Sequence, residues 1–111
     1  MSRGDVYWFN LDPTVGSEMK KTRLCVVVMH DPSGNSPVTI VCPLTDAGGR
    51  AGNLLNPVVA AGTGGATKDS RVACHQVRTL DKHRVVGGKA GELPAPIMAA
   101  VSAGLEAILG L

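Results

Sequence analysis

Arg23 stands where a polar loop meets an apolar strand, and its side chain is the clearest candidate for chemistry in the chain. The stretch from Asp12 to Val28 opens with proline, glycine and several charged residues and ends in a run of cysteine and valine. A cation at this junction would be held by a rigid strand. Its planar guanidinium can bind two oxygens of one phosphate or carboxylate.

Two further side chains, His75 and Glu18, have the chemistry to exchange a proton or orient a charged neighbour. Histidine ordinarily titrates near pH 6.5, which suits general acid or base catalysis. Glu18 lies in the loop before Arg23 and could orient that arginine or accept a hydrogen bond from a ligand. Each also has an ordinary interpretation, because many polar strand histidines are inert and many loop carboxylates are only solvated.

Short apolar runs separated by turn residues must form the elements that position these side chains. The first run is almost continuously apolar, so we expect both of its faces to be covered, one of them by a partner subunit. A bent strand or strand pair is expected over residues 71–79, interrupted at His75 and Gln76. The other expected strands are Val6–Leu11, Leu24–Met29, Val38–Leu44 and Pro57–Ala60.

The end of the chain has the pattern of a helix. A single helical turn is expected over Leu80–Arg84, and a longer helix begins near Pro96, a residue tolerated in a first turn. Its apolar residues recur at helical spacing and are Ile97, Val101, Leu105 and Ile108. Short strands followed by one helix predict a mainly β fold with a C-terminal α-helix, built on a small, strongly bent antiparallel sheet or barrel.

Composition indicates one small domain, residues 1–111, with a local basic site. The 11 lysines and arginines against 9 acidic residues leave a net charge of only +2, which argues against a general polyanion-coating protein. The aromatic side chains are Tyr7, Trp8 and Phe9, all in the first strand, so a base-stacking platform has weak support. A domain of this size gains stability from dimerisation.

Cysteine usage and hydropathy indicate the compartment. Cys25, Cys42 and Cys74 follow no metal-ligand spacing and sit among apolar residues, so we expect buried, reduced thiols rather than a disulfide or zinc site. Reduced thiols favour a cytoplasmic protein. No signal sequence or membrane-spanning run is recognisable.

Several motifs together resemble the MazF/PemK family of toxin endoribonucleases. The resemblance runs through nearly the whole chain, and the C-terminal helix fits it. The motifs are Arg3-Gly4-Asp5-Val6-Tyr7, Asp12-Pro13-Thr14 with Gly16-Ser17-Glu18, Thr22-Arg23, Pro43-Leu44-Thr45, and Gln76-Val77-Arg78-Thr79-Leu80-Asp81.

This resemblance implies an SH3-like toxin barrel of the MazF, CcdB and Kid type, and an endoribonuclease active site. Arg23 and Thr45 match the family's catalytic arginine and threonine, and His75 or Glu18 would supply acid or base chemistry. The implied reaction is sequence-specific, metal-independent cleavage of single-stranded RNA. The 2'-hydroxyl attacks and leaves 2',3'-cyclic phosphate and 5'-hydroxyl ends. No cofactor is expected.

The RNA-binding residues expected along the backbone path and in the loops are Ser17, Lys20, Lys21, Gln76, Arg78 and Lys82. The implied partners are single-stranded RNA, a second copy in a homodimer, and a MazE-like antitoxin whose acidic tail blocks the basic groove.

The chain departs from the family pattern at two places. Some relatives have arginine and aspartate where Ala73 and His75 stand here, and most have proline where Leu24 follows Arg23. Two alternatives stay open, and the missing arginine bears only on the second of them. One is a CcdB-like toxin that poisons a topoisomerase by protein contact, and the other is a catalytically inactive RNA-binding or antitoxin-binding module.

Overall fold

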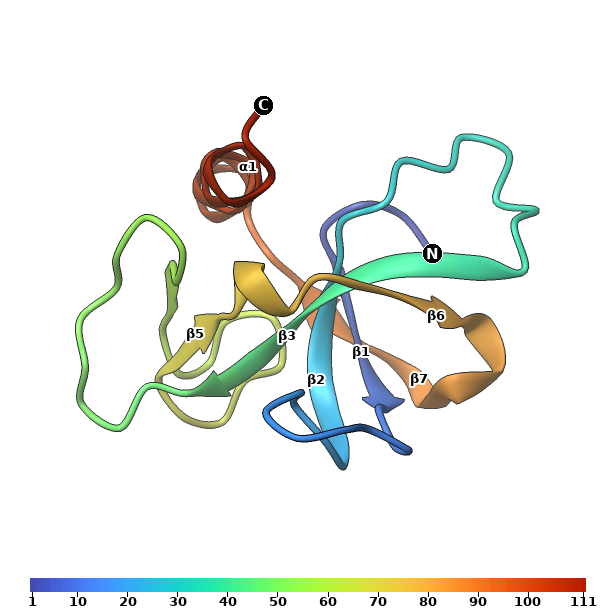
Figure 1. Ribbon diagram of the computed structural model, residues 1–111, viewed down its shortest axis with the longest axis horizontal. Coiled ribbons are helices and arrows are strands. Elements are labelled where there is room, and N and C mark those ends of the chain that lie inside the picture. The colour runs from blue at the N-terminus through green and yellow to red at the C-terminus, as the bar shows by residue number, and fades with distance from the viewer.

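A computed structural model describes all residues, 1–111, and shows seven strands, two short 3-10 turns and one C-terminal helix (Figure 1). The strands form one antiparallel sheet in the order β4-β5-β3-β2-β1-β7, with β6 also pairing with β3. The predicted class, mainly β with a C-terminal helix on a bent antiparallel sheet, is confirmed. The elements are β1 Asp5–Asn10, β2 Thr22–Val27, β3 Val38–Asp46, β4 Val58–Val59, β5 Ser70–Val72, η1 Cys74–Gln76, β6 Arg78–Asp81, η2 Lys82–Arg84, β7 Val85–Glu92 and α1 Ala95–Leu109.

The long strand β3 organises the sheet. Its first half pairs with β6 from Val38 to Val41, and its last residues, Leu44 to Asp46, pair with β5. The other edge of β3 pairs with β2. Of the two alternatives expected over residues 71–79, two strands are present rather than one bent strand. They pair with different halves of β3 and are joined by η1, which contains the polar residues His75 and Gln76.

Side chains on the two faces of the sheet belong to two apolar clusters. The larger cluster contains Leu24, Leu44 and Val72 from three neighbouring strands, and Val101 of α1 packs into it. The smaller cluster, on the opposite face, contains Phe9, Cys25 and other residues of the same strands together with Leu80 of β6. Strands in the middle of the sheet thus have both faces covered, which explains their almost continuous apolar sequence.

The helix α1 begins one residue before the predicted proline and ends at Leu109, and the left-handed backbone of the following Gly110 caps its last turn. Val101 and Gly104 are its buried residues, whereas Ile108 and Leu109 are exposed. Only part of the apolar surface of α1 therefore packs on the sheet. No helix of the chain is long and apolar enough to cross a membrane.

Strand β7 was not predicted, because its sequence is rich in glycine and weak in β-forming residues. The reason is a close backbone contact. A Cβ atom added at Gly91 would come within 2.6 Å of the carbonyl carbon of Gly64, so only glycine lets the loop before β5 lie directly on β7.

The three cysteines are free and fully buried, as predicted. Burial raises the pKa of the Cys25 thiol to about 12, although the nearby guanidinium groups of Arg23 and Arg78 act in the opposite direction. Within the single chain Phe9 of β1 is buried and Trp8 is 42% exposed, and the expected cover from a partner subunit stays a prediction.

Candidate functional site

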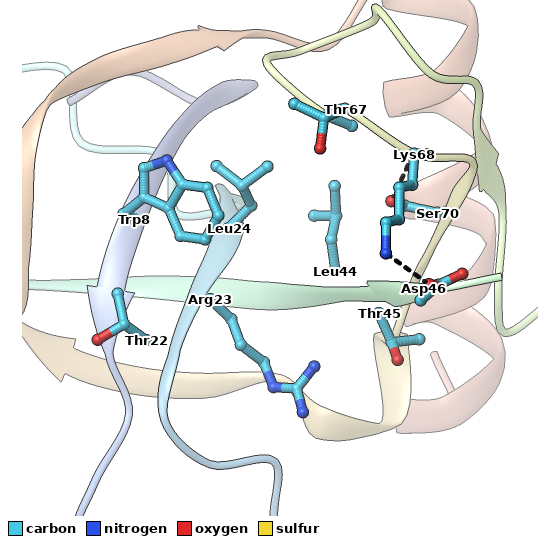
Figure 2. A pocket seen from close by; sticks show the side chains of 11 residues that line it. Trp8, Thr22, Arg23, Leu24, Leu44, Thr45, Asp46, Thr67, Lys68 and Ser70 are labelled. Atoms are coloured by element: carbon cyan, nitrogen blue, oxygen red, sulfur yellow. Dashed lines mark hydrogen bonds and ion pairs between the residues drawn. The ribbon is translucent and has the colours of Figure 1, made fainter. Parts of the chain in front are cut away.

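Arg23 and Thr45 line one open cleft of about 250 Å³ between β2, β3 and the loop before β5 (Figure 2). In this view the side chains of Arg23, from β2, and Thr45, from β3, lie on the same side of the β3 ribbon. The cleft is lined by Trp8, Thr22, Arg23, Leu24, Leu44, Thr45, Asp46, Ala66, Thr67, Lys68 and Ser70.

The loop from β1 to β2 positions Arg23. The amide of Leu11 donates to the carbonyl oxygen of Lys21 at 2.9 Å and closes the base of the loop. Lys21 has a φ of 69°, an uncommon conformation for a residue with a side chain, and it reverses the chain just before β2. The Nε of Arg23 then donates to the carbonyl oxygen of Lys20 at 2.9 Å.

The two terminal nitrogens of Arg23 make no hydrogen bond or ion pair within the chain, since its one side-chain bond uses Nε. The arginine is half-buried. This geometry leaves the two-pronged face of the guanidinium available for an anion in the cleft.

Thr45 lies one residue before the end of β3, and its side chain makes no hydrogen bond in the structure. It sits directly opposite Arg71 of β5. Asp46, the next residue, forms an ion pair with Lys68 at 3.8 Å between two exposed side chains. Such a surface pair is weak, so both groups can reorganise around a ligand.

Trp8 is one of the cleft residues that sequence reasoning missed. Its indole lines the same cleft as Arg23 and Thr45 and is 42% exposed. All the aromatic residues fall in one strand, which argued against a stacking surface. The informative signal would have been alternation, because in β1 Phe9 points into the core and its neighbour Trp8 must point the other way.

A second cleft, of about 430 Å³, contains most of the other predicted residues. Its lining includes Ser17, Glu18, His75, Gln76 and Arg78 but neither Arg23 nor Thr45. His75 is exposed. The carboxylate of Glu18 accepts a 2.6 Å hydrogen bond from the amide of Val15, and no ion pair joins it to Arg23.

Gln76 and Arg78 hold the β1–β2 loop in place. The side-chain amide of Gln76 accepts from the Met19 amide at 3.2 Å and donates to the Ser17 carbonyl at 3.3 Å. Arg78 donates to the carbonyl of Leu11 at 3.3 Å. The same loop therefore supports both clefts, since it also supplies the carbonyl that fixes Arg23.

The three predicted lysines differ in their surroundings. Lys82 forms an ion pair with Asp31 at 3.6 Å and donates to the Gly34 carbonyl at 3.4 Å. Lys20 and Lys21 are exposed and form no ion pair, and neither lines one of the two clefts. These two remain free to contact an extended ligand that crosses the loop.

The lining of the first cleft thus includes a fixed guanidinium and a free hydroxyl on one face of the sheet and an exposed indole on the other. A guanidinium and a hydroxyl can share the oxygens of one phosphodiester, and an indole can stack on a nucleobase. Asp46 is the one carboxylate in its lining.

Known proteins resemble this chain over most of its length. The model of the family described as "PemK-like, MazF-like toxin of type II toxin-antitoxin system" matches residues 2–109. Endoribonuclease EndoA of Bacillus subtilis is 34% identical over 113 residues, covering 100% of this chain and 96% of EndoA. Endoribonuclease MazF of Staphylococcus epidermidis is 38% identical over 85 residues, covering 75% of this chain and 70% of that protein.

Solved structures show the same fold. MazF from Deinococcus radiodurans superposes with a TM-score of 0.83 at 26% identity, covering 100% of this chain and 97% of the other. A mycobacterial endoribonuclease in complex with its cognate antitoxin has a TM-score of 0.78 at 19% identity, with 100% and 96% coverage. The predicted toxin barrel is confirmed, and the chain belongs to the PemK-like, MazF-like toxin family of type II toxin-antitoxin systems.

Proposed function

We propose that the chain is a sequence-specific, metal-independent endoribonuclease that cleaves single-stranded RNA as the toxin of a toxin-antitoxin pair. The observation that carries this proposal is the unbonded fork of Arg23 in one cleft with the hydroxyl of Thr45. The names of the relatives, which are endoribonucleases, support it. One toxin domain over residues 1–111 would perform the whole reaction.

In the proposed reaction the substrate supplies its own nucleophile. The ribose 2'-oxygen bonds to phosphorus, the bond from phosphorus to the 5'-oxygen breaks, and a 2',3'-cyclic phosphate and a 5'-hydroxyl result. One proton leaves the 2'-hydroxyl and one is gained by the departing 5'-oxygen. DNA has no 2'-hydroxyl and cannot react by this route.

Arg23 would stabilise the charge that builds on the non-bridging phosphate oxygens in the transition state. Its fork matches two oxygens, and its bond to the Lys20 carbonyl holds it in place before the substrate arrives. A guanidinium stays protonated in proteins and is a poor base, so the role is electrostatic. Thr45 would donate its hydroxyl proton in a hydrogen bond to a phosphoryl oxygen.

The proton acceptor would be one of three side chains. Asp46 lines the same cleft as Arg23, whereas His75 and Glu18 line the neighbouring one. Asp46→Asn, His75→Asn and Glu18→Gln each remove the basic group with little change in shape. The acceptor is the residue whose replacement flattens the rising limb of the pH-rate profile.

RNA on either side of the cut would contact the loops and the two clefts. Lys20 and Lys21 are exposed and unpaired, which suits phosphate contacts. Ser17, Gln76, Arg78 and Lys82 already have roles within the fold, so contacts from them would be made by the donors that remain free. Trp8 pairs with Leu24 in the β1–β2 ladder and lies on the other face of the sheet from Arg23, so it would stack on a base at the opposite side of the cleft.

The proposed partners are a second copy in a homodimer and an antitoxin. Related structures include a mycobacterial endoribonuclease with its cognate antitoxin and a MazE-MazF complex from Deinococcus radiodurans. An antitoxin segment with acidic side chains would compete with RNA for the free fork of Arg23.

The decisive experiment digests a long single-stranded RNA with purified protein in excess EDTA and maps both ends of each product. Cleavage at a recurring sequence with 2',3'-cyclic phosphate and 5'-hydroxyl ends is expected, with no products from Arg23→Ala. Cleavage that requires added metal, or 5'-phosphate ends, would contradict the proposed chemistry. No cleavage by a folded protein that inhibits a topoisomerase would favour the CcdB-like alternative.

A further inference from the structure

Arg71, Thr45 and Arg23 lie side by side on three neighbouring strands. The β3–β5 ladder pairs Thr45 directly with Arg71. The β2–β3 ladder pairs Cys25 with Pro43, and two further steps of the same antiparallel register bring Arg23 beside Thr45. Thr45 therefore has an arginine on each side.

The three side chains also leave the sheet on the same face. Residues directly opposite each other in antiparallel strands project to the same side. The adjacent row of Leu24, Leu44 and Val72 lies in the core cluster under the helix, so the row of Arg23, Thr45 and Arg71 projects away from that core. In Figure 2, Leu24 and Leu44 lie on one side of β3, and Arg23 and Thr45 lie on the other.

Arg71 is an unsatisfied buried cation. The residue is 7% exposed, and its Nε is sealed from solvent without a hydrogen-bond partner. No ion pair of the chain includes Arg71. An unpaired buried charge destabilises a fold unless something binds it. Nε is the only side-chain nitrogen of Arg71 that is both sealed from solvent and without a hydrogen-bond partner. The two terminal nitrogens, which also have no partner, therefore still reach the surface.

We propose that Arg71 is a positioning residue that binds the RNA backbone at a phosphate flanking the one held by Arg23. This inference rests on the proposed function and deepens it. Strands lie about 4.8 Å apart, so the backbones of β2 and β5 are separated by roughly 10 Å across Thr45. Two arginines at that spacing can each bind one of two neighbouring phosphates. Together they would fix which nucleotide of the RNA lies over Thr45. Two arginines in one row fit the repeated phosphates of an RNA backbone better than they fit an isolated carboxylate of a protein partner.

The test measures RNA binding and stability of the same variants. The probe is a fluorescein-labelled, fully 2'-O-methylated RNA of mixed sequence, which has no free 2'-hydroxyl and cannot be cleaved. The variants are Arg71→Met, which keeps the buried stem, Arg71→Lys, which keeps the charge, and Arg50→Met as a control. Arg50 is an exposed arginine that donates to the Ala47 carbonyl and lies outside both clefts.

Arg71→Met is expected to weaken binding at least about tenfold and to reduce the slope of log affinity against log salt by about 0.7, the loss of one phosphate contact on a single strand. Its Tm should stay equal or rise, because an unpaired buried cation is replaced by an apolar side chain of similar length. Arg71→Lys should restore the slope. Arg50→Met should change affinity less than about threefold.

The outcomes separate this inference from the proposed function. If Arg71→Met binds the probe like the wild type, or if its Tm falls, Arg71 is structural or serves a protein partner and the inference fails while ribonuclease activity stands. If the wild type binds through Arg71 but cleaves no RNA, the contact stands and the reaction fails. If the wild type neither binds nor cleaves RNA, both fail.

Discussion

The Nε of Arg23 donates a 2.9 Å hydrogen bond to the carbonyl oxygen of Lys20, so the loop that precedes β2 holds the arginine by one nitrogen and leaves the other two free. A guanidinium fixed in this way loses little conformational entropy when it binds an anion. The loop carbonyl thus orients the guanidinium of Arg23, which the proposed reaction would use.

Arg23→Ala should abolish cleavage and leave the fold intact. A transition-state contact of this kind contributes roughly 3 kcal/mol, which corresponds to a loss of at least about a hundredfold in single-turnover rate. Arg23→Lys keeps the charge but loses the fork and the Nε bond, so it should recover only a small part of the rate. Circular dichroism checks the fold, and an active, folded Arg23→Ala protein would remove Arg23 from the mechanism.

Thr45→Val should lower the single-turnover rate strongly while RNA affinity changes little. The substitution keeps the branched shape and removes only the hydroxyl, which has no partner within the chain. Thr45→Ser, which retains the hydroxyl, is the matched control and should keep most of the activity. A fall in affinity with an unchanged rate would make Thr45 a binding residue.

Trp8→Ala should weaken RNA binding by about 1–3 kcal/mol, because one base loses its stacking surface. Trp8→Phe keeps an aromatic face and should retain most of the affinity. The indole is 42% exposed, so the effect on stability should be small. Affinity for uncleavable RNA and Tm are measured together. Equal affinities of the alanine and phenylalanine variants would argue against stacking.

The buried Cys25 should be unreactive in the native protein and should make stability fall at high pH. Burial raises its pKa from the ordinary 9.0 to about 12. Between these values the unfolded chain loses the thiol proton and the folded chain keeps it. The free energy of unfolding therefore falls as pH rises, by at most about 1.4 kcal/mol per pH unit.

Two measurements check this effect. Ellman's reagent at pH 8 should react with the cysteines only as fast as the protein unfolds. Denaturant unfolding from pH 8 to 10.5 should show a steeper decline for the wild type than for Cys25→Val, which lacks the titrating group. Parallel declines, or fast labelling of the native protein, would contradict the burial of this thiol.

Gly104→Ala should destabilise the protein even though alanine favours a helix by about 1 kcal/mol. A Cβ at this position would lie 2.7 Å from the Leu54 carbonyl oxygen and 2.8 Å from the Cys74 sulfur, so α1 would have to move away from the sheet. Overpacking of this kind costs about 1–3 kcal/mol and outweighs the gain in propensity. A lower Tm is expected.

Ala99→Gly, on the exposed side of the same helix, isolates the propensity contribution and should cost about 1 kcal/mol. A rise in Tm for Gly104→Ala would show that the helix can shift without loss of contacts.

The sequence alone determined the features that depend on neighbouring residues. Proline and glycine placed the turns, the apolar runs placed β1, β2 and β3, and helical spacing placed α1 within one residue of its start. The motifs around Arg23 and Thr45 identified the family, because such a resemblance depends on residue types and their spacing along the chain.

Tertiary structure alone decided which distant residues share a cleft. The pairing of Thr45 with Arg71 and the separation of His75 and Glu18 from Arg23 both depend on how distant segments pack. Strand β7 could not be predicted from the sequence, because its glycines permit close contact with Gly64 and do not favour an extended backbone. Register and close approach are set by packing between segments far apart in the chain, and a local pattern carries no record of that packing.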